Sequence, residues 1–175
     1  IHVSELVTSR IQQAREQLNE RRQEIRAMHA AGATGAQVVA ALTVLVDGIV
    51  ARLTAAAVDD LSPSDSVAFE SDMALVALGG YGRAELAPFS DVDLMFLYRP
   101  AAKSVAEPLC SRLVRDFWDS NLALGSCMRT PAECLALARH DASVHTALLE
   151  SRHVVGNPWL TGELRDQITR LTRGR

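Results

Sequence analysis

The sequence predicts an α+β fold in which helices flank a small mixed sheet and a helical hairpin precedes that sheet. Apolar residues make up 48% of the 175 residues, but aromatic residues make up only 5%. Leu, Val and Ala must therefore fill the core, which favours helices with a small sheet over an all-β sandwich. Segments with helical periodicity stand at both ends of the chain, and short apolar runs typical of buried strands lie between them.

The length fits one domain, or one domain with a helical appendage. We divide the chain into an N-terminal helical segment at 1–60, a core that contains the strands at 61–130, and a C-terminal helical segment at 131–175. The first residue is Ile1 rather than Met. We therefore expect the chain to be a fragment of a longer multidomain protein.

Two long helices are expected before the sheet. Residues 4–30 place apolar side chains at helical spacing between Arg and Glu, and residues 37–58 are rich in Ala, Val and Leu. Glycines between the two segments predict a turn, so the helices form an antiparallel hairpin. The sequence leaves open whether this hairpin packs on the core or contacts a partner. Residues 59–71 contain Pro63 with several Ser and Asp, and they predict a linker or surface loop.

Three strands are expected in the core. Residues 73–78 (MALVAL) form a short apolar run that ends at a Gly-Gly pair, which is typical of a buried strand. Residues 91–98 (DVDLMFLY) carry apolar side chains on both faces after their first turn, so this strand is predicted to be central in the sheet. Residues 121–129 (NLALGSCMR) supply the third strand.

The remaining segments are predicted to be helical. Residues 104–120 form a helix with Pro108 in its first turn, where a proline is tolerated. Thr130 begins the next helix as the N-cap of a capping box. Residues 131–155 form one broken helix or two short helices, and a final helix opens near Thr161.

Charge and composition exclude several classes of function. The net charge is −3 and the basic residues are scattered among acidic ones, so no basic footprint for DNA or RNA is present. The three cysteines have no zinc-ligand or redox spacing. The start of the chain is no secretory signal, and no run approaches the roughly 20 apolar residues of a membrane helix. We expect a cytoplasmic protein that contacts neither membrane nor nucleic acid.

Two carboxylates open the central strand. Asp91 and Asp93 are two residues apart, so both point to one face of the strand with Cα atoms about 6.5–7 Å apart. Their mutual repulsion is removed by a hard divalent cation, and carboxylate oxygens suit Mg²⁺. Two such metal ions about 3.5–4 Å apart clamp the attacking and departing oxygens of an in-line phosphoryl displacement.

The segment before these carboxylates carries groups that suit phosphate. Gly79 and Gly80 permit positive φ and close backbone approach, and their N–H groups suit phosphate oxygens. Residues 81–87 are expected to start a short helix, where Arg83 offers a planar fork of donors and Ser90 offers a hydroxyl. The alternative is a tight glycine turn followed by two surface aspartates. The joint pattern of strand, Gly-Gly, ten residues and Asp-Val-Asp favours the phosphate site.

The segment GGYGRAELAPFSDVDL resembles the signature of the PII uridylyltransferases, nucleotidyltransferases of the DNA polymerase beta superfamily that attach UMP to the PII nitrogen-signalling protein. The stretch DFWDSNLALGSCMRTPAECLALARHDASVHTALLESRHVVGNPWL resembles the region that follows in that family. The helices before Leu61 also resemble the family's N-terminal lead. The resemblance covers most of the chain and implies a nucleotidyltransferase core.

The resemblance also implies site residues and substrates. Gly79 and Gly80 would bind the nucleotide phosphates, and Asp91 and Asp93 would hold Mg²⁺, or Mn²⁺ in its place. UTP or another NTP would be the donor, with a tyrosine of PII as acceptor and pyrophosphate as product. The superfamily usually supplies a third carboxylate from the third strand, near Ala123 or Gly125 here, and neither is acidic.

The missing acid leaves two interpretations open. In the first, the chain is a nucleotidyltransferase that works with two strand carboxylates. In the second, it is a catalytically impaired module that binds nucleotide or has a regulatory role. Other acids would substitute for the missing carboxylate or else lie at the surface or in helix caps: Asp116, Asp119, Glu133 and Asp141.

Arg129 and the dipeptide His140-Asp141 are two further candidates for a functional role. Arg129 ends the third strand, where it either faces the triphosphate or serves a salt bridge or helix cap. His140 and Asp141 spell the dipeptide of HD phosphohydrolases. That dipeptide falls in an ordinary helix of the family that the chain resembles, so we do not expect it to bind metal.

Overall fold

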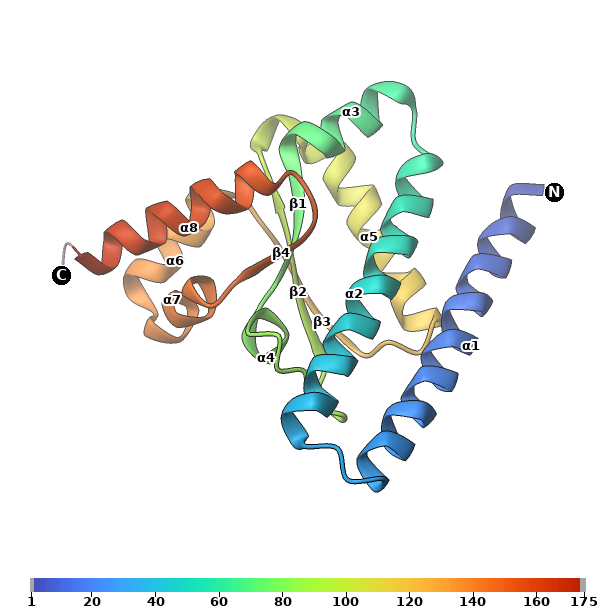
Figure 1. The fold of residues 1–175 in the computed structure, drawn as a ribbon. Helices are drawn as coiled ribbons and strands as arrows, with labels where there is room; N and C mark the ends of the chain where they lie inside the picture. The colour runs from blue at the N-terminus through green and yellow to red at the C-terminus, as the bar shows by residue number, and fades with distance from the viewer. Residues whose placement is uncertain (1, 174–175) are drawn as a thin grey trace.

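The computed structural model describes residues 2–173, with side chains described for residues 7–172. In this range, α-helices and one short 3-10 helix surround a sheet (Figure 1). The helices are α1 (His2–Ala30), α2 (Gly35–Asp59), α3 (Pro63–Asp72), α4 (Gly79–Gly82), η1 (Pro100–Ala102), α5 (Lys103–Asp119), α6 (Pro131–His140), α7 (Ala142–Leu149) and α8 (Pro158–Arg173). The strands are β1 (Met73–Ala77), β2 (Val92–Tyr98), β3 (Leu124–Arg129) and β4 (Arg152–Gly156).

The strands form one mixed sheet in the order β3-β2-β1-β4. β1 pairs antiparallel with β2 and β4, whereas β2 pairs parallel with β3. The parallel pair requires a crossover connection, which α5 supplies between β2 and β3. β2 is an inner strand, and all its residues except Asp93 are buried. This confirms the central place predicted from its apolar residues on both faces.

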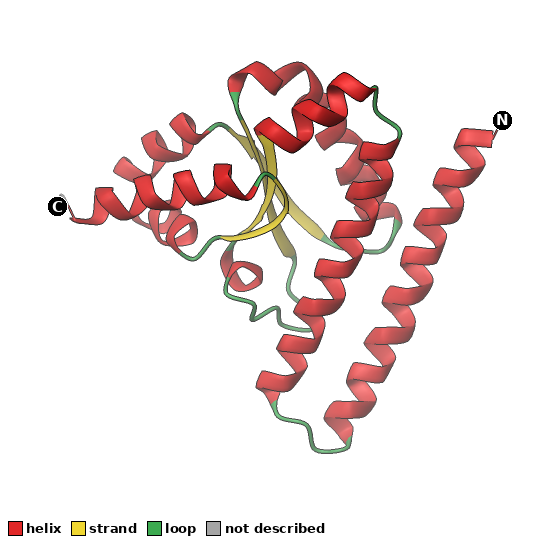
Figure 2. Cartoon of the chain, turned by 45° about the horizontal axis from the view of Figure 1, so that its top comes forward, coloured by secondary structure: helices red, strands yellow, loops and turns green. Residues whose placement is uncertain are grey.

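Helices cover both faces of the sheet. Successive side chains of a strand point to opposite faces. On one face, Leu75 and Phe96 belong to a core shared with α1, α2, α3 and α5. On the other face, Val76 and Met95 pack against α6, α7 and α8. Figure 2 shows the sheet between these two helical layers, so the predicted α+β fold is confirmed.

The predicted N-terminal hairpin is present and is part of the core. Thr34 caps α2 in a capping box: the Gln37 N–H donates to the Thr34 hydroxyl at 3.3 Å, and the Thr34 N–H donates to the Gln37 side chain at 2.8 Å. α2 lies against the sheet layer with Ile49 and Val50 fully buried, and α1 lies outside it (Figure 1). The hairpin therefore packs on the core along α2.

α2 differs from the expectation on apolar runs. By length and composition this helix of 25 residues is apolar enough to cross a membrane, although no such run was expected. Half of its most apolar window is buried inside the protein, and its Asp47 forms an ion pair with Arg152 of β4. Both observations are typical of the core helix of a globular fold.

The segment 59–71 was predicted to be a loop, and this prediction was wrong. Residues Pro63–Asp72 form α3, with Ser62 as its N-cap and Pro63 in its first turn. The Ser62 hydroxyl accepts a hydrogen bond from the Asp65 N–H at 3.2 Å. The Ser, Pro and Asp that suggested a loop are thus the start signal of a helix. Phe69 is buried and fixes α3 on the core.

The prediction of one broken helix or two short helices over 131–155 was wrong only at its end. α6 and α7 are the two short helices, but residues Arg152–Gly156 form strand β4. β4 pairs with β1 across a long stretch of sequence, with a register shift between Leu75 and Val76. Its β-branched Val154 and Val155 favour a strand. Pairing with β1 makes this segment a strand, and the local periodicity of the sequence does not show which distant segment it pairs with.

Three smaller boundaries also differ from the expectations. The helix expected at 81–87 is a single turn, α4, followed by a loop that leads to β2. Pro108 lies inside α5 rather than in its first turn, because α5 begins at Lys103 after the 3-10 turn η1. α8 begins at Pro158 instead of Thr161, and the Asn157 side chain accepts from the Trp159 N–H at 2.9 Å.

Replacing Gly156 by Ala should destabilise the fold, because Gly156 has φ +89° and an added Cβ would lie 2.5 Å from the Met73 carbonyl oxygen. Left-handed backbone and steric overlap together predict a loss of about 2–4 kcal/mol in the free energy of unfolding. Gly162→Ala in α8 is the control, because nothing lies within 4 Å of its added Cβ. It should stabilise by about 0.5–1 kcal/mol. Equal urea midpoints for both variants would contradict this account.

Candidate active site

The Gly-Gly turn lies where β1 ends and faces the start of β2. The Leu78 N–H donates to the Asp93 carbonyl oxygen at 2.9 Å, so the two segments stay paired up to the turn. Gly79 has φ +55° and, with Gly80, opens α4. The N–H groups at the first positions of a helix have no acceptor inside it. Backbone donors are therefore presented next to the first residues of β2.

The Asp93 carboxylate occupies the space between two glycines. A Cβ added to Gly79 would lie 3.1 Å from Asp93 Oδ2, and one added to Gly125 would lie 2.7 Å from Asp93 Oδ1. Gly125 is the partner of Asp93 in the parallel pair of β2 and β3. The missing side chains on α4 and β3 thus provide the room that this carboxylate fills.

The two aspartates form a concentration of negative charge. Burial raises the pKa of the Asp93 carboxyl above its ordinary value, and the charge of Asp91 raises it further. Two oxygen-donor carboxylates on one face fit a hard cation such as Mg²⁺, which takes its other ligands from phosphates and water. Within the described residues, no group of three or more His, Cys, Asp or Glu is placed to hold a metal ion.

The structure locates the place of the missing third carboxylate. The Val92 N–H donates to the Ala123 carbonyl oxygen at 2.9 Å, which sets Ala123 beside Asp91 just as Gly125 lies beside Asp93. Ala123 is exposed and has room for a longer side chain. Gly125 has no such room, because its added Cβ would meet Asp93.

Three of the four acids that could substitute for the third carboxylate serve other contacts. Asp116 lies 3.5 Å from the Arg112 guanidinium. Glu133 completes the capping box at the start of α6, and Asp141 caps α7 by accepting from the Ser143 N–H at 2.8 Å. The His-Asp dipeptide thus marks the boundary between α6 and α7. The carboxylate of Asp119 takes part in no ion pair among the described residues.

The three remaining predicted nucleotide-binding residues lie at different distances from the carboxylates. Ser90 is exposed and directly precedes Asp91. Arg83 is held by two carboxylates, with Nε 3.0 Å from Glu85 and a terminal nitrogen 2.6 Å from Glu150. Arg129 pairs with Leu97 at the other end of β3, four residues or about 13 Å beyond Gly125. The structure brings Ser90 to the aspartates and leaves Arg129 apart from them.

A polar network that the sequence analysis missed supports the turn. The Arg152 guanidinium donates to both carboxylate oxygens of Asp47 at 2.9 and 3.0 Å, and to the Tyr81 carbonyl oxygen at 3.2 Å. The Tyr81 hydroxyl donates to Asp47 at 2.6 Å, and its ring lies under the guanidinium at 5.1 Å. Burial raises the pKa of the Tyr81 phenol, and the hydrogen bond to Asp47 raises it further.

This network joins three elements around the Gly-Gly turn. Asp47 comes from α2, Tyr81 from α4 and Arg152 from β4. Directly after Tyr81, Gly82 fits closely, since its added Cβ would lie 2.7 Å from the Glu150 carbonyl oxygen. One signal in the sequence pointed to the network: Asp47 is the only acid between Gly35 and Val58, in a helix rich in Ala, Val and Leu.

The known proteins that this chain is similar to are nucleotidyltransferases. The family profile described as glutamate-ammonia ligase adenylyltransferase matches residues 2–113. The chain is 35% identical over 153 residues to a bifunctional uridylyltransferase/uridylyl-removing enzyme of Azospirillum brasilense, with 87% of this chain and 16% of that protein covered. It is 39% identical over 126 residues to the enzyme of the same description from Cereibacter sphaeroides, with 72% and 14% covered.

A third relative shows a shorter match of higher identity. The bifunctional uridylyltransferase/uridylyl-removing enzyme of Burkholderia pseudomallei is 45% identical over 85 residues, which covers 49% of this chain and 10% of that protein. The chain thus spans no more than about a sixth of the length of these curated relatives.

Replacing Asp47 by Ala should destabilise the protein, because it leaves the Arg152 guanidinium and the Tyr81 hydroxyl without their acceptor. Hydrogen bonds to charged groups predict a loss of about 2 kcal/mol in the free energy of unfolding, measured by urea denaturation. Asp59→Ala is the control, because Asp59 is exposed in the last turn of the same helix. It should change stability by less than about 0.5 kcal/mol. Indistinguishable unfolding curves for the two variants would show that the network adds no stability.

Proposed function

The chain belongs to the nucleotidyltransferase family described as glutamate-ammonia ligase adenylyltransferase, and from that premise we propose that it transfers a nucleoside monophosphate to a protein hydroxyl. The observation that carries this proposal is the position of Asp93, between Gly79 of the Gly-Gly turn and Gly125 of β3. Phosphate-binding backbone and metal-binding carboxylates then meet at one end of the sheet.

We propose UTP as the donor and a tyrosine of a PII-type signalling protein as the acceptor. The support is the likeness to proteins described as uridylyltransferases, together with the signature residues from Gly79 to Asp93. The acceptor oxygen forms a bond to the α-phosphorus of UTP. The bond from that phosphorus to the oxygen that bridges to the β-phosphate breaks, pyrophosphate leaves, and the hydroxyl proton passes to solvent. We place this reaction in the cytoplasm.

Each part of the site has a role in this reaction. The N–H groups of Gly79 and Gly80 bind phosphate oxygens of the donor. Asp91 and Asp93 would hold Mg²⁺, or Mn²⁺ in its place, which would supply positive charge for the phosphate oxygens of the donor. Ser90 donates a hydrogen bond to the same phosphates. Arg83 keeps the loop after α4 in place through Glu85 and Glu150.

A second candidate function rests on a specific observation. Ala123 and Gly125 supply no third carboxylate beside the aspartate pair. A site without it has no strand acid to accept the proton of the acceptor, so acceptor activation is weaker. The chain would then bind a nucleotide and a metal ion without transferring a nucleotidyl group, as a regulatory module.

Asp93→Asn should abolish transfer. The experiment incubates the protein with Mg²⁺, UTP and a purified PII-type protein, and intact mass reports the addition of one UMP. Metal-assisted charge stabilisation of several kcal/mol predicts a fall of at least about 100-fold in the rate. Asp59→Asn is the control and should transfer at the wild-type rate. Metal-dependent UTP binding by the wild type without transfer to the acceptor would favour the second candidate function.

Ala123→Glu should raise the rate of transfer about 10-fold or more, because it adds a carboxylate beside Asp91 that accepts the proton of the acceptor. Gly125→Glu should lower the rate, since its Cβ would displace the Asp93 carboxylate. The same mass assay measures both variants at equal protein concentration. Equal rates for the two variants would show that the place of the missing acid has been wrongly assigned.

A further inference from the structure

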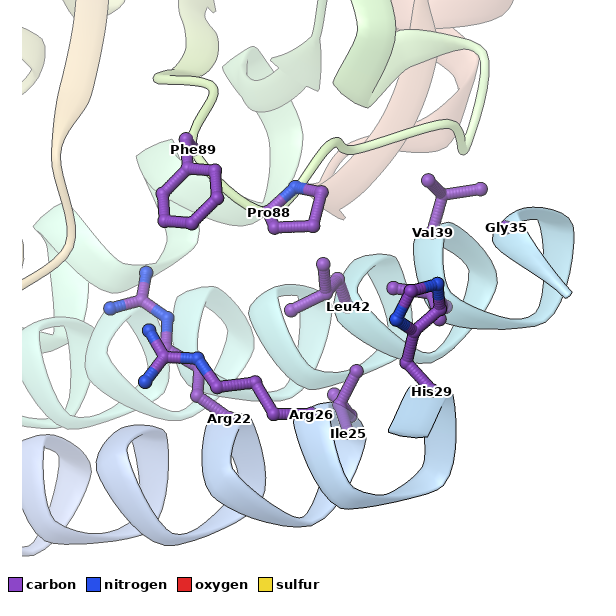
Figure 3. A pocket seen from close by; sticks show the side chains of 10 residues that line it. Arg22, Ile25, Arg26, His29, Gly35, Val39, Leu42, Pro88 and Phe89 are labelled. Carbon is purple, nitrogen blue, oxygen red and sulfur yellow. The ribbon is translucent and has the colours of Figure 1, made fainter. Parts of the chain in front are cut away.

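A cavity of about 450 Å³ lies beside the catalytic segment, between the α1–α2 hairpin and the loop that precedes β2. Its wall is apolar: Ile25 comes from α1, Val39 and Leu42 come from α2, and Pro88 comes from the loop (Figure 3). None of these side chains belongs to the phosphate or metal site. The cavity therefore offers apolar surface that the transfer chemistry does not use.

Two arginines form one end of this cavity. Arg22 and Arg26 are four residues apart on α1, so they lie on the same face of the helix, and Figure 3 shows their guanidinium groups side by side near Phe89. Neither forms an ion pair within the described part of the chain. The Arg22 guanidinium donates a hydrogen bond to the Asn121 carbonyl oxygen at 3.4 Å. Burial lowers the pKa of Arg22, and the charge of Arg26 lowers it further.

The cavity adjoins the catalytic carboxylates through Phe89. Phe89 lies two positions before Asp91, with only Ser90 between them, so their Cα atoms are at most about 7 Å apart. The Phe89 side chain is 91% exposed although it is a large aromatic ring. An exposed aromatic residue next to arginines is the composition that protein interfaces favour. A partner that covers Phe89 is therefore brought within reach of the metal site.

We propose that this cavity binds the acceptor protein, through a segment that carries an acidic side chain beside an apolar one. The acidic side chain pairs with Arg22 and Arg26, and the apolar one covers Phe89 and Pro88, which are both exposed. The inference rests on the proposed function, because it names the surface that orients the acceptor hydroxyl toward Asp91. Charge complementarity and the exposed ring favour a protein segment over the nucleotide, whose phosphates have their own donors at the Gly-Gly turn.

The test compares the Arg22→Gln/Arg26→Gln double variant with Arg21→Gln. Arg21 is on the same helix, but it forms an ion pair with Glu24 and does not line this cavity. The double variant should raise the KM for a purified PII-type protein about 10-fold or more, while the KM for UTP stays at the wild-type value. Salt should raise the acceptor KM of the wild type more steeply than that of the double variant. Arg21→Gln should behave as the wild type does.

Phe89→Ala supplies an independent variant, because removal of an exposed side chain leaves the core intact. It should also raise the acceptor KM and leave the KM for UTP unchanged. Titration calorimetry without UTP measures direct binding of the PII-type protein. This binding should be weaker for Phe89→Ala and for the double variant than for the wild type. Thermal unfolding of each variant separates loss of binding from loss of fold.

The outcomes separate this inference from the proposed function. An unchanged acceptor KM in the double variant overturns the inference, even while the wild type transfers UMP. The same holds if the double variant loses stability without any change in acceptor KM, since the cavity then contacts another part of the same protein. If the wild type transfers no UMP, the proposed function fails, and calorimetric binding that the double variant loses still supports the docking surface.

Discussion

One carboxylate holds the candidate site together. Asp47 accepts hydrogen bonds from Arg152 and from the Tyr81 hydroxyl, so it ties α2 to β4 and to the turn after β1. The turn needs such support because its glycines have no side chains to pack. The arrangement also has a cost, since Arg152 Nε is buried without a hydrogen-bond partner. The bidentate ion pair and the stacked Tyr81 ring offset that cost. The position of the backbone that we propose to bind phosphate thus depends on a residue of the N-terminal hairpin.

Space beside Asp93 is the second constraint on the site. Gly79 and Gly125 leave open the two positions where a Cβ would touch its carboxylate. The same glycine that makes this room on β3 stands at one of the two positions considered for a third acid. A side chain at Gly125 and the present position of Asp93 exclude each other, whereas Ala123 is open. The absence of an acid at Gly125 is therefore connected with the position that the Asp93 carboxylate occupies.

Local patterns in the sequence were sufficient for most helices and for three of the four strands, and for the pairing of Gly-Gly with Asp-Val-Asp. The errors share a physical origin. α3 was missed because Ser62 and Pro63 mark a helix start as well as a loop. β4 was missed because its pairing with β1 is long-range. The same reason hid the ion pair of Asp47 with Arg152, which joins residues 105 positions apart. The periodicity of a sequence indicates local structure, but it does not indicate which distant residues come into contact.

Charges of opposite sign gather in two separate places near the loop that precedes β2. On one side, burial raises the pKa of Asp93 and the charge of Asp91 raises it further, and neither carboxylate forms an ion pair among the described residues. On the other side, burial lowers the pKa of Arg22 and the charge of Arg26 lowers it further, and these two arginines likewise form no ion pair within the described range. Buried charges in folded proteins are usually paired, but here the arginines lie on α1 and the aspartates lie at the start of β2. Each cluster is therefore open to a ligand of opposite charge, and we propose a cation with its nucleotide at the aspartates and an acidic protein segment at the arginines. Because Phe89 at the cavity lies two positions before Asp91, these two proposals together would bring donor and acceptor close to each other, as transfer between them requires.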